Sequence, residues 1–285
     1  MIQFTLSAFS DELSPDIDEQ LKWLSENGVK YIEIRGVNGK NISELDEKEV
    51  KELRIKLDAY GIKPSCIGSP IGKINILDDF SGQKELCRKI CEYAKILGTD
   101  KIRVFSFFMP EGEDPDSYRD EVMARMRELC YIAKQYSVIL CHENEKNIYG
   151  DTPERCLDLY CEMQGDMKCV FDHANFISCD VEAYPYAFNM LSHTLSHMHI
   201  KDANEEKEMV VAGKGIGRIP ETVKDVANRY EGEFILTLEP HLMEFSGLQG
   251  LESEGHTSIL GNRYESPKAA FAAAKEALEK IINNI

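Results

Sequence analysis

The chain has 285 residues, 43% of them hydrophobic, so it is long enough for one large α/β domain or two small ones. Its formal net charge of −17 repels phosphate backbones, and we expect no nucleic acid among its partners. Nine cysteines without a CxxC pair indicate reduced thiols rather than a disulfide framework.

The N-terminus has neither the basic start nor the long apolar core of a signal peptide. No apolar run approaches the ~20 residues needed to cross a bilayer. The sequence therefore predicts a cytoplasmic protein without a membrane partner, and it leaves homo-oligomerisation open.

Short apolar or alternating segments predict strands in chain order. They are residues 2–9, 31–36, 63–69, 101–107, 138–144, 169–176, 197–202 and 234–241. Capping residues followed by proline predict helix starts between them, at Ser14, Asp114, Thr152 and Ser266. Glycines that precede strands predict helix ends, at Gly28, Gly61 and Gly98.

Alternation of about eight strands with helices predicts a parallel sheet, and this number favours a single (β/α)8 TIM barrel over residues 1–285. An open doubly wound sheet is the structural alternative. The stretch 213–218, "GKGIGR", is one glycine short of a dinucleotide motif and does not directly follow a strand. Residues 242–265 are rich in glycine and serine and are expected to form a long loop before the last helix.

Polar side chains stand near the ends of the last four predicted strands. On each of these strands, alternate residues share one face. The residues on that face are Cys141, Glu143 and Glu145 on the fifth strand, Val170, Asp172 and Ala174 on the sixth, His197, His199 and Lys201 on the seventh, and Ile235, Thr237, Glu239 and His241 on the eighth. On the sixth strand, His173 and Asn175 are expected on the other face. Because catalytic groups in barrels sit at strand ends, these residues are candidates for a site.

Three carboxylates inside one barrel would repel each other in a low dielectric, and a divalent cation removes that cost. Carboxylate and imidazole ligands suit Mn²⁺, Zn²⁺, Co²⁺ or Fe²⁺, and the excess of hard oxygens makes Mn²⁺ the first choice. Some of these groups have a plainer explanation as buried ion pairs. Arg35 and Arg103 would then neutralise Glu33 or Glu145, and Lys201 would pair with Asp202 or Glu145.

At these positions the chain resembles the sugar phosphate isomerase/epimerase family of the xylose isomerase-like TIM barrel superfamily. The resemblance covers nearly the whole chain and rests on "HENE", "FDHAN", "HMHIKD" and "LTLEPH". It implies one divalent metal held by Glu143, Asp172, His199 and Glu239. In the ketose 3-epimerases of this family, the two glutamates also move the proton. The resemblance implies the same role for Glu143 and Glu239. Those enzymes have a substrate-contacting histidine where this chain has Asn175, which puts the orientation of the substrate in doubt.

The expected reaction is metal-dependent isomerisation or epimerisation of a small sugar, sugar phosphate or related keto compound. A cation that holds a carbonyl stabilises the enediolate formed when a glutamate removes the neighbouring proton. Six further residues are expected at the substrate, namely Lys201, Arg103, Asn175, Glu145, His173 and Lys73. Lys73, Lys214 and Arg218 lie in glycine-containing loops, but we expect these glycines to shape turns rather than to bind phosphate.

Other functions share parts of this pattern. Loss of a hydroxyl after the same first step would make the protein a dehydratase of the inosose or dehydroshikimate type. An endonuclease IV-like repair enzyme is disfavoured, because no histidine precedes His142 and the charge is strongly negative. A non-catalytic sugar-binding barrel is disfavoured by the intact Glu143 and Glu239.

Overall fold

The computed structural model describes residues 2–245 and 264–285. Eight parallel strands form the central sheet, in the order β1-β12-β9-β8-β7-β6-β5-β2. Their bounds are β1 Ile2–Ala8, β2 Tyr31–Ile34, β5 Lys63–Gly68, β6 Lys101–Val104, β7 Ile139–Glu143, β8 Met167–Asp172, β9 Leu195–Ile200 and β12 Gly232–Leu238. Since β1 and β2 lie side by side at the two ends of this order, the sheet nearly closes into a barrel. The predicted (β/α)8 barrel is confirmed, and the open doubly wound alternative is wrong.

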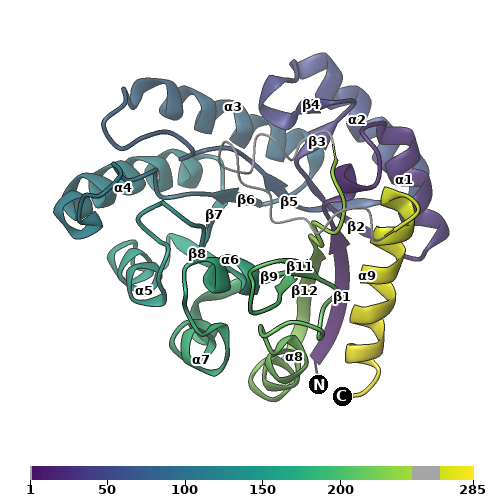
Figure 1. Cartoon of the computed structure of the whole chain (residues 1–285). Coiled ribbons are helices and arrows are strands. Elements are labelled where there is room, and N and C mark those ends of the chain that lie inside the picture. The colour runs from purple at the N-terminus through teal and green to yellow at the C-terminus, as the bar shows by residue number, and fades with distance from the viewer. Residues whose placement is uncertain (1, 246–263) are drawn as a thin grey trace.

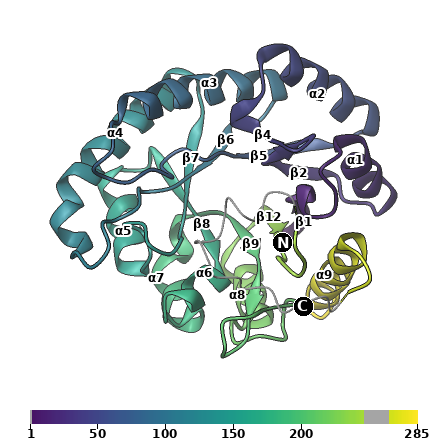
Figure 2. The ribbon, with the colours of Figure 1, turned by 45° about the horizontal axis from the view of Figure 1, so that its top comes forward.

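Helices surround the strands and form the outer layer (Figure 1, Figure 2). Their bounds are α1 Ile17–Glu26, α2 Glu47–Tyr60, α3 Ser81–Leu97, α4 Arg119–Gln135, α5 Pro153–Glu162, α6 His173–Ser178, α7 Phe188–Leu191, α8 Ile219–Arg229 and α9 Pro267–Ile282. Two small antiparallel pairs lie outside the barrel sheet. They are β3 Gly36–Val37 with β4 Lys40–Asn41, and β10 Asp202–Ala203 with β11 Met209–Val210.

Helix boundaries follow the capping chemistry of the sequence with one shift. Thr152 and Ser266 cap α5 and α9, each with proline in the first turn, as predicted. The predicted start at Ser14 is wrong, because the side chain of Asp16 accepts the Glu19 N–H and begins α1 two residues later. Asp114 caps a 3₁₀ turn, Pro115–Tyr118, that leads into α4.

Alternation along the strands separates two environments. On β2, Ile32 and Ile34 belong to the apolar core, whereas Glu33 between them is buried against side chains of β9 and β12. The register brings His199 of β9 opposite both Asp172 of β8 and Thr237 of β12. The polar ends of neighbouring strands therefore lie at one level of the barrel.

Two sequence predictions concern segment ends. The sixth strand was expected to run to residue 176, but it ends at Asp172 because this side chain accepts the Asn175 N–H and caps α6. The long loop predicted over 242–265 lies largely outside the described residues, since 246–263 are not described. Within the described part of the chain, no helix is both long and apolar enough to cross a membrane.

Candidate metal centre and active site

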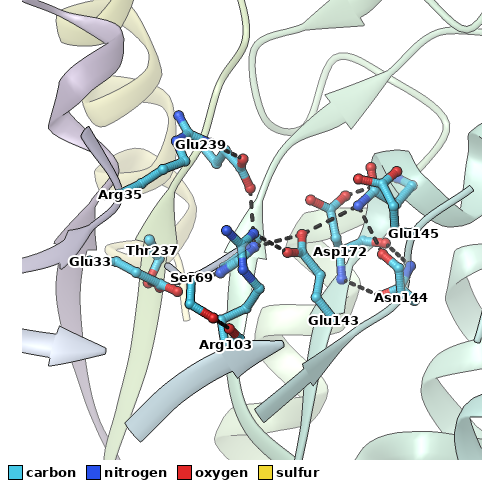
Figure 3. Close-up of polar contacts among 12 residues, drawn as sticks. Glu33, Arg35, Ser69, Arg103, Glu143, Asn144, Glu145, Asp172, Thr237 and Glu239 are labelled. Carbon is cyan, nitrogen blue, oxygen red and sulfur yellow. Dashed lines mark hydrogen bonds and ion pairs between the residues drawn. The ribbon is translucent and has the colours of Figure 1, made fainter. Parts of the chain in front are cut away.

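Four buried side chains converge at the carboxyl ends of four neighbouring strands. Glu143 ends β7, Asp172 ends β8, His199 lies on β9, and Glu239 directly follows β12. One ligand atom from each lies within 4.8 Å of all the others. In Figure 3 the three carboxylates point toward one another. We call these four residues the cage, and its convergence matches the arrangement predicted from the strand ends.

His199 lies between two of the cage carboxylates. Its Nδ1 is 2.9 Å from Glu143 Oε1 and 3.1 Å from Glu239 Oε2. Burial by itself raises the pKa of Glu143, but His199 and Arg103 outweigh that effect and lower the pKa to about 2. Glu143 is therefore ionised at neutral pH and can act as a ligand or as a base.

Each carboxylate of the cage also has a basic partner. Arg103 Nη1 donates to Glu143 Oε2 at 2.6 Å, and Arg35 Nη1 donates to Glu239 Oε1 at 2.7 Å. Lys201 Nζ lies 3.0 Å from Asp172 Oδ2. These cations offset the cost of burying three carboxylates at one point.

The observed pairs differ from the ion pairs considered as alternatives in the sequence. Arg35 does not neutralise Glu33, because Glu33 Oε2 faces the imidazoles of His197 and His199. Arg103 pairs with Glu143, and Glu145 instead lies 3.5 Å from Lys73 Nζ. Lys201 does not pair with Asp202.

Asp202 is engaged by the glycine-containing loop after β9. Its carboxylate accepts the backbone N–H groups of Gly213, Gly215 and Gly217 at 2.9–3.0 Å. These amides are thus already bonded within the protein. This arrangement agrees with the expectation that the glycines of the loop shape a turn.

The cage fits a divalent cation by its own chemistry. Asp172 Oδ2 and Glu239 Oε2 are fully buried, the first 3.0 Å from Lys201 Nζ and the second 3.1 Å from His199 Nδ1. Burial raises the pKa of Asp172 to about 7, although Lys201 lowers it. Glu143 and Glu239 also raise the pKa of Asp172, so the three carboxylates repel one another, and a bound cation would relieve that repulsion.

Two other groups of buried side chains also have ligand atoms close together. Glu12, Glu239 and His241 form one, but the Arg35 guanidinium lies 3.5 Å from Glu12 and 2.7 Å from Glu239 and already supplies positive charge there. The other group is Glu33, Cys66 and His197. In it, Glu33 Oε2 lies within 3.2 Å of the Thr237 hydroxyl and of one ring nitrogen each of His197 and His199.

A cavity with about 510 Å³ of empty space, its open mouth included, adjoins the cage. It is lined by Lys73, Arg103, Glu143, Glu145, Lys146, Asn175, Ser178, Lys201, Met209, Glu239 and His241. Five of the six residues predicted to meet substrate are among them. The sixth, His173, is not.

Strand alternation assigned His173 and Asn175 to the same face, opposite Asp172, and only His173 keeps it. Its imidazole turns away from the cavity, packs against Phe171 and lies 3.1 Å from Thr222 Oγ1. Asn175 turns inward, and its Nδ2 donates to Glu143 Oε1 at 3.3 Å. The structure thus gives no support to a substrate contact by His173.

Several side chains around the cage were not among the residues predicted to bind metal or substrate. Arg35 holds Glu239, and His241 lines the cavity. Asn144 holds Asp172 in place, since its amide donates to the Asp172 carbonyl and accepts the Asp172 N–H, both at 2.9 Å. A signal for Arg35 was present, because Glu33 and Arg35 interrupt an apolar strand at a spacing of two residues.

Comparison with known proteins agrees with this geometry. The family model "Xylose isomerase-like TIM barrel" matches residues 21–254. A 3-dehydroshikimate dehydratase from Bacillus anthracis is 23% identical over 205 residues, which cover 68% of this chain and 72% of that protein.

Solved structures support the same fold at low sequence identity. The IOLI protein with a bound zinc atom superposes with a TM-score of 0.76 at 16% identity, over 98% of both chains. D-psicose 3-epimerase from Clostridium cellulolyticum H10 gives a TM-score of 0.72 at 15% identity, over 98% of both chains. These superpositions establish the fold. Because the sequence identities are low, they do not identify the reaction.

Proposed function

Since the chain belongs to the xylose isomerase-like TIM barrel family, we propose that it is a metal-dependent isomerase or epimerase of a small sugar, sugar phosphate or related keto compound. The observation that carries this proposal is the placement of Glu143 and Glu239. They come from β7 and β12, which are separated in the sheet by β8 and β9, and both reach the same imidazole nitrogen. Two carboxylates on different sides of one point suit proton removal and return.

We propose that Glu143, Asp172, His199 and Glu239 hold one divalent cation, with Mn²⁺ as the first choice and Zn²⁺, Co²⁺ or Fe²⁺ as alternatives. When bound, the cation would supply Lewis-acid polarisation of the substrate carbonyl. One glutamate then removes the proton from the adjacent carbon, and the other returns a proton to the resulting enediolate. Arg103 and Arg35 keep Glu143 and Glu239 oriented, and Arg103 and Lys201 donate to substrate oxygens.

The remaining polar residues of the cavity would orient the substrate. Asn175 Nδ2 lies close enough to Glu143 to contact a hydroxyl that approaches this carboxylate. Lys73 and Glu145 form a pair at the same cavity, 3.5 Å apart, and offer a donor and an acceptor to the far end of a polyhydroxylated molecule. Neither pattern selects a particular sugar.

A dehydratase is the second candidate, favoured by the match to 3-dehydroshikimate dehydratase. It would begin with the same proton removal and end with expulsion of a hydroxide from the next carbon. A carboxylate and a lysine at one cavity, such as Glu239 and Lys201, could perform both steps.

The experiment that separates these reactions uses the Mn²⁺-loaded protein in D₂O with a panel of ketoses, keto acids and inososes. Proton NMR reports deuterium at the carbon beside the carbonyl, and ultraviolet absorbance reports an enone. We expect metal-dependent deuterium uptake with an inverted or isomerised product. Enone formation would identify the dehydratase, whereas a metal-loaded protein that exchanges no proton across the panel would contradict the proposal.

A further inference from the structure

Glu33 lies on β2 and contacts His199 of β9, a residue of the proposed metal cage. The contact is on the side of the imidazole that faces away from the cage carboxylates. Glu33 Oε2 lies 3.2 Å from His199 Nε2, and both side chains are fully buried. Figure 3 shows Glu33 and Thr237 to the left of Glu143 and Asp172. Glu33 is absent from the residues that line the cavity, so its contacts with the site run through His199.

The two ring nitrogens of His199 thus have different surroundings. Nε2 faces Glu33, and Nδ1 faces the carboxylates of Glu143 and Glu239. When Nε2 carries the hydrogen and donates it to Glu33, the Nδ1 lone pair is directed into the cage. A neutral imidazole has one donor and one acceptor nitrogen, so the acceptor at Glu33 selects the tautomer that can bind a cation.

Glu33 is itself held firmly. Thr237 Oγ1 donates to the same Oε2 at 3.1 Å, and His197 Nε2 lies 3.2 Å from it. The Phe9 and His199 rings pack in a T-shaped arrangement, with centroids 5.0 Å apart. The carboxylate and the imidazole it faces therefore have little freedom to rotate.

We propose that Glu33 is a positioning residue that holds His199 in the Nε2–H tautomer with Nδ1 directed at the metal. This inference rests on the proposed metal site. Residues that hydrogen-bond to metal-binding histidines fix ring orientation, and their loss lowers metal affinity by about 10- to 100-fold. Thr237 provides a matched control, because its hydroxyl bonds the same buried oxygen of Glu33 but forms no hydrogen bond with His199.

The test compares the full-length protein with Glu33→Ala, Glu33→Gln and Thr237→Val. Affinity for Zn²⁺ is measured by competition with a chelator, and thermal unfolding of the metal-free forms is recorded in parallel. We expect about 10- to 100-fold weaker binding in Glu33→Ala. Binding should be less reduced in Glu33→Gln, which keeps an acceptor oxygen, and should change by less than about threefold in Thr237→Val.

A second readout is the tautomer itself. Long-range ¹H–¹⁵N spectra of the Zn²⁺ form should show a proton on His199 Nε2 in the wild type. A proton on Nδ1 would overturn the inference, as would Glu33→Ala and Glu33→Gln variants that melt earlier but bind Zn²⁺ as tightly as the wild type. Two zinc ions per wild-type chain, with one lost in Glu33→Gln, would make Glu33 a ligand and would also overturn it. A wild type that binds no metal would instead refute the metal site.

Discussion

Asp172 combines a structural role with the proposed metal role, and the two can be separated by mutation. Its Oδ1 accepts the Asn175 N–H at 2.9 Å and caps α6, and its Oδ2 lies 3.0 Å from Lys201 Nζ. Both side chains of the ion pair are buried. The variant Asp172→Ala therefore removes a cap and leaves a buried ammonium without its nearest partner.

The expected cost to the metal-free protein follows from these two contacts. Loss of a helix cap costs about 1 kcal/mol, and removal of one partner of a buried ion pair costs about 3–5 kcal/mol. The sum is a large part of the roughly 5–15 kcal/mol by which domains are stable. The double variant Asp172→Asn with Lys201→Met keeps a capping oxygen and removes both charges, so it should recover most of the loss.

Urea unfolding in the presence of a chelator measures these stabilities. Metal content after loading with Mn²⁺ and desalting is measured by mass spectrometry. We expect the double variant to fold nearly as stably as the wild type but to retain little metal. Full metal occupancy in that variant would refute the assignment of Asp172 as a ligand. Equal stability of Asp172→Ala and the double variant would refute the account of the ion pair.

Three further outcomes are expected. Glu143→Gln and Glu239→Gln should each lower kcat by about 10²- to 10⁴-fold with smaller changes in KM, and normal turnover in both would place the base elsewhere. Burial lowers the pKa of His142 from 6.5 to about 4. Between these pH values the unfolded chain binds a proton that the folded His142 does not, so the contribution of His142 to stability should fall by about 3 kcal/mol as the pH drops. His142→Gln should flatten that dependence in urea unfolding at several pH values. Gly72→Ala would place a Cβ 2.0 Å from a backbone carbonyl oxygen at a φ of +87° and should cost at least about 2 kcal/mol, whereas Gly82→Ala, with no neighbour within 4 Å, should not lower the melting temperature.

The alternation of strands and helices was predictable from the sequence because it depends on local properties. Each predicted strand segment overlaps a strand of the barrel sheet, since apolar periodicity and glycine or proline boundaries act over a few residues. The cage was predictable for a related reason. Parallel strands end at the same edge, so titratable residues near the ends of consecutive strands meet there. The extent of a single domain over 1–285 stays a prediction, because 246–263 are not described.

The partners of the buried charges were decided by the tertiary structure alone. Arg35 and Glu239 are 204 residues apart in the chain and meet because the barrel closes between β1 and β2. Glu33 reaches His199 across the same closure. Asn175 was expected beside His173 on the face opposite Asp172, but it turns into the cavity because the cap at Asp172 starts a helix and changes the period from two residues to 3.6. Such pairings depend on distances across the folded barrel, and neighbouring residues in the sequence do not encode those distances.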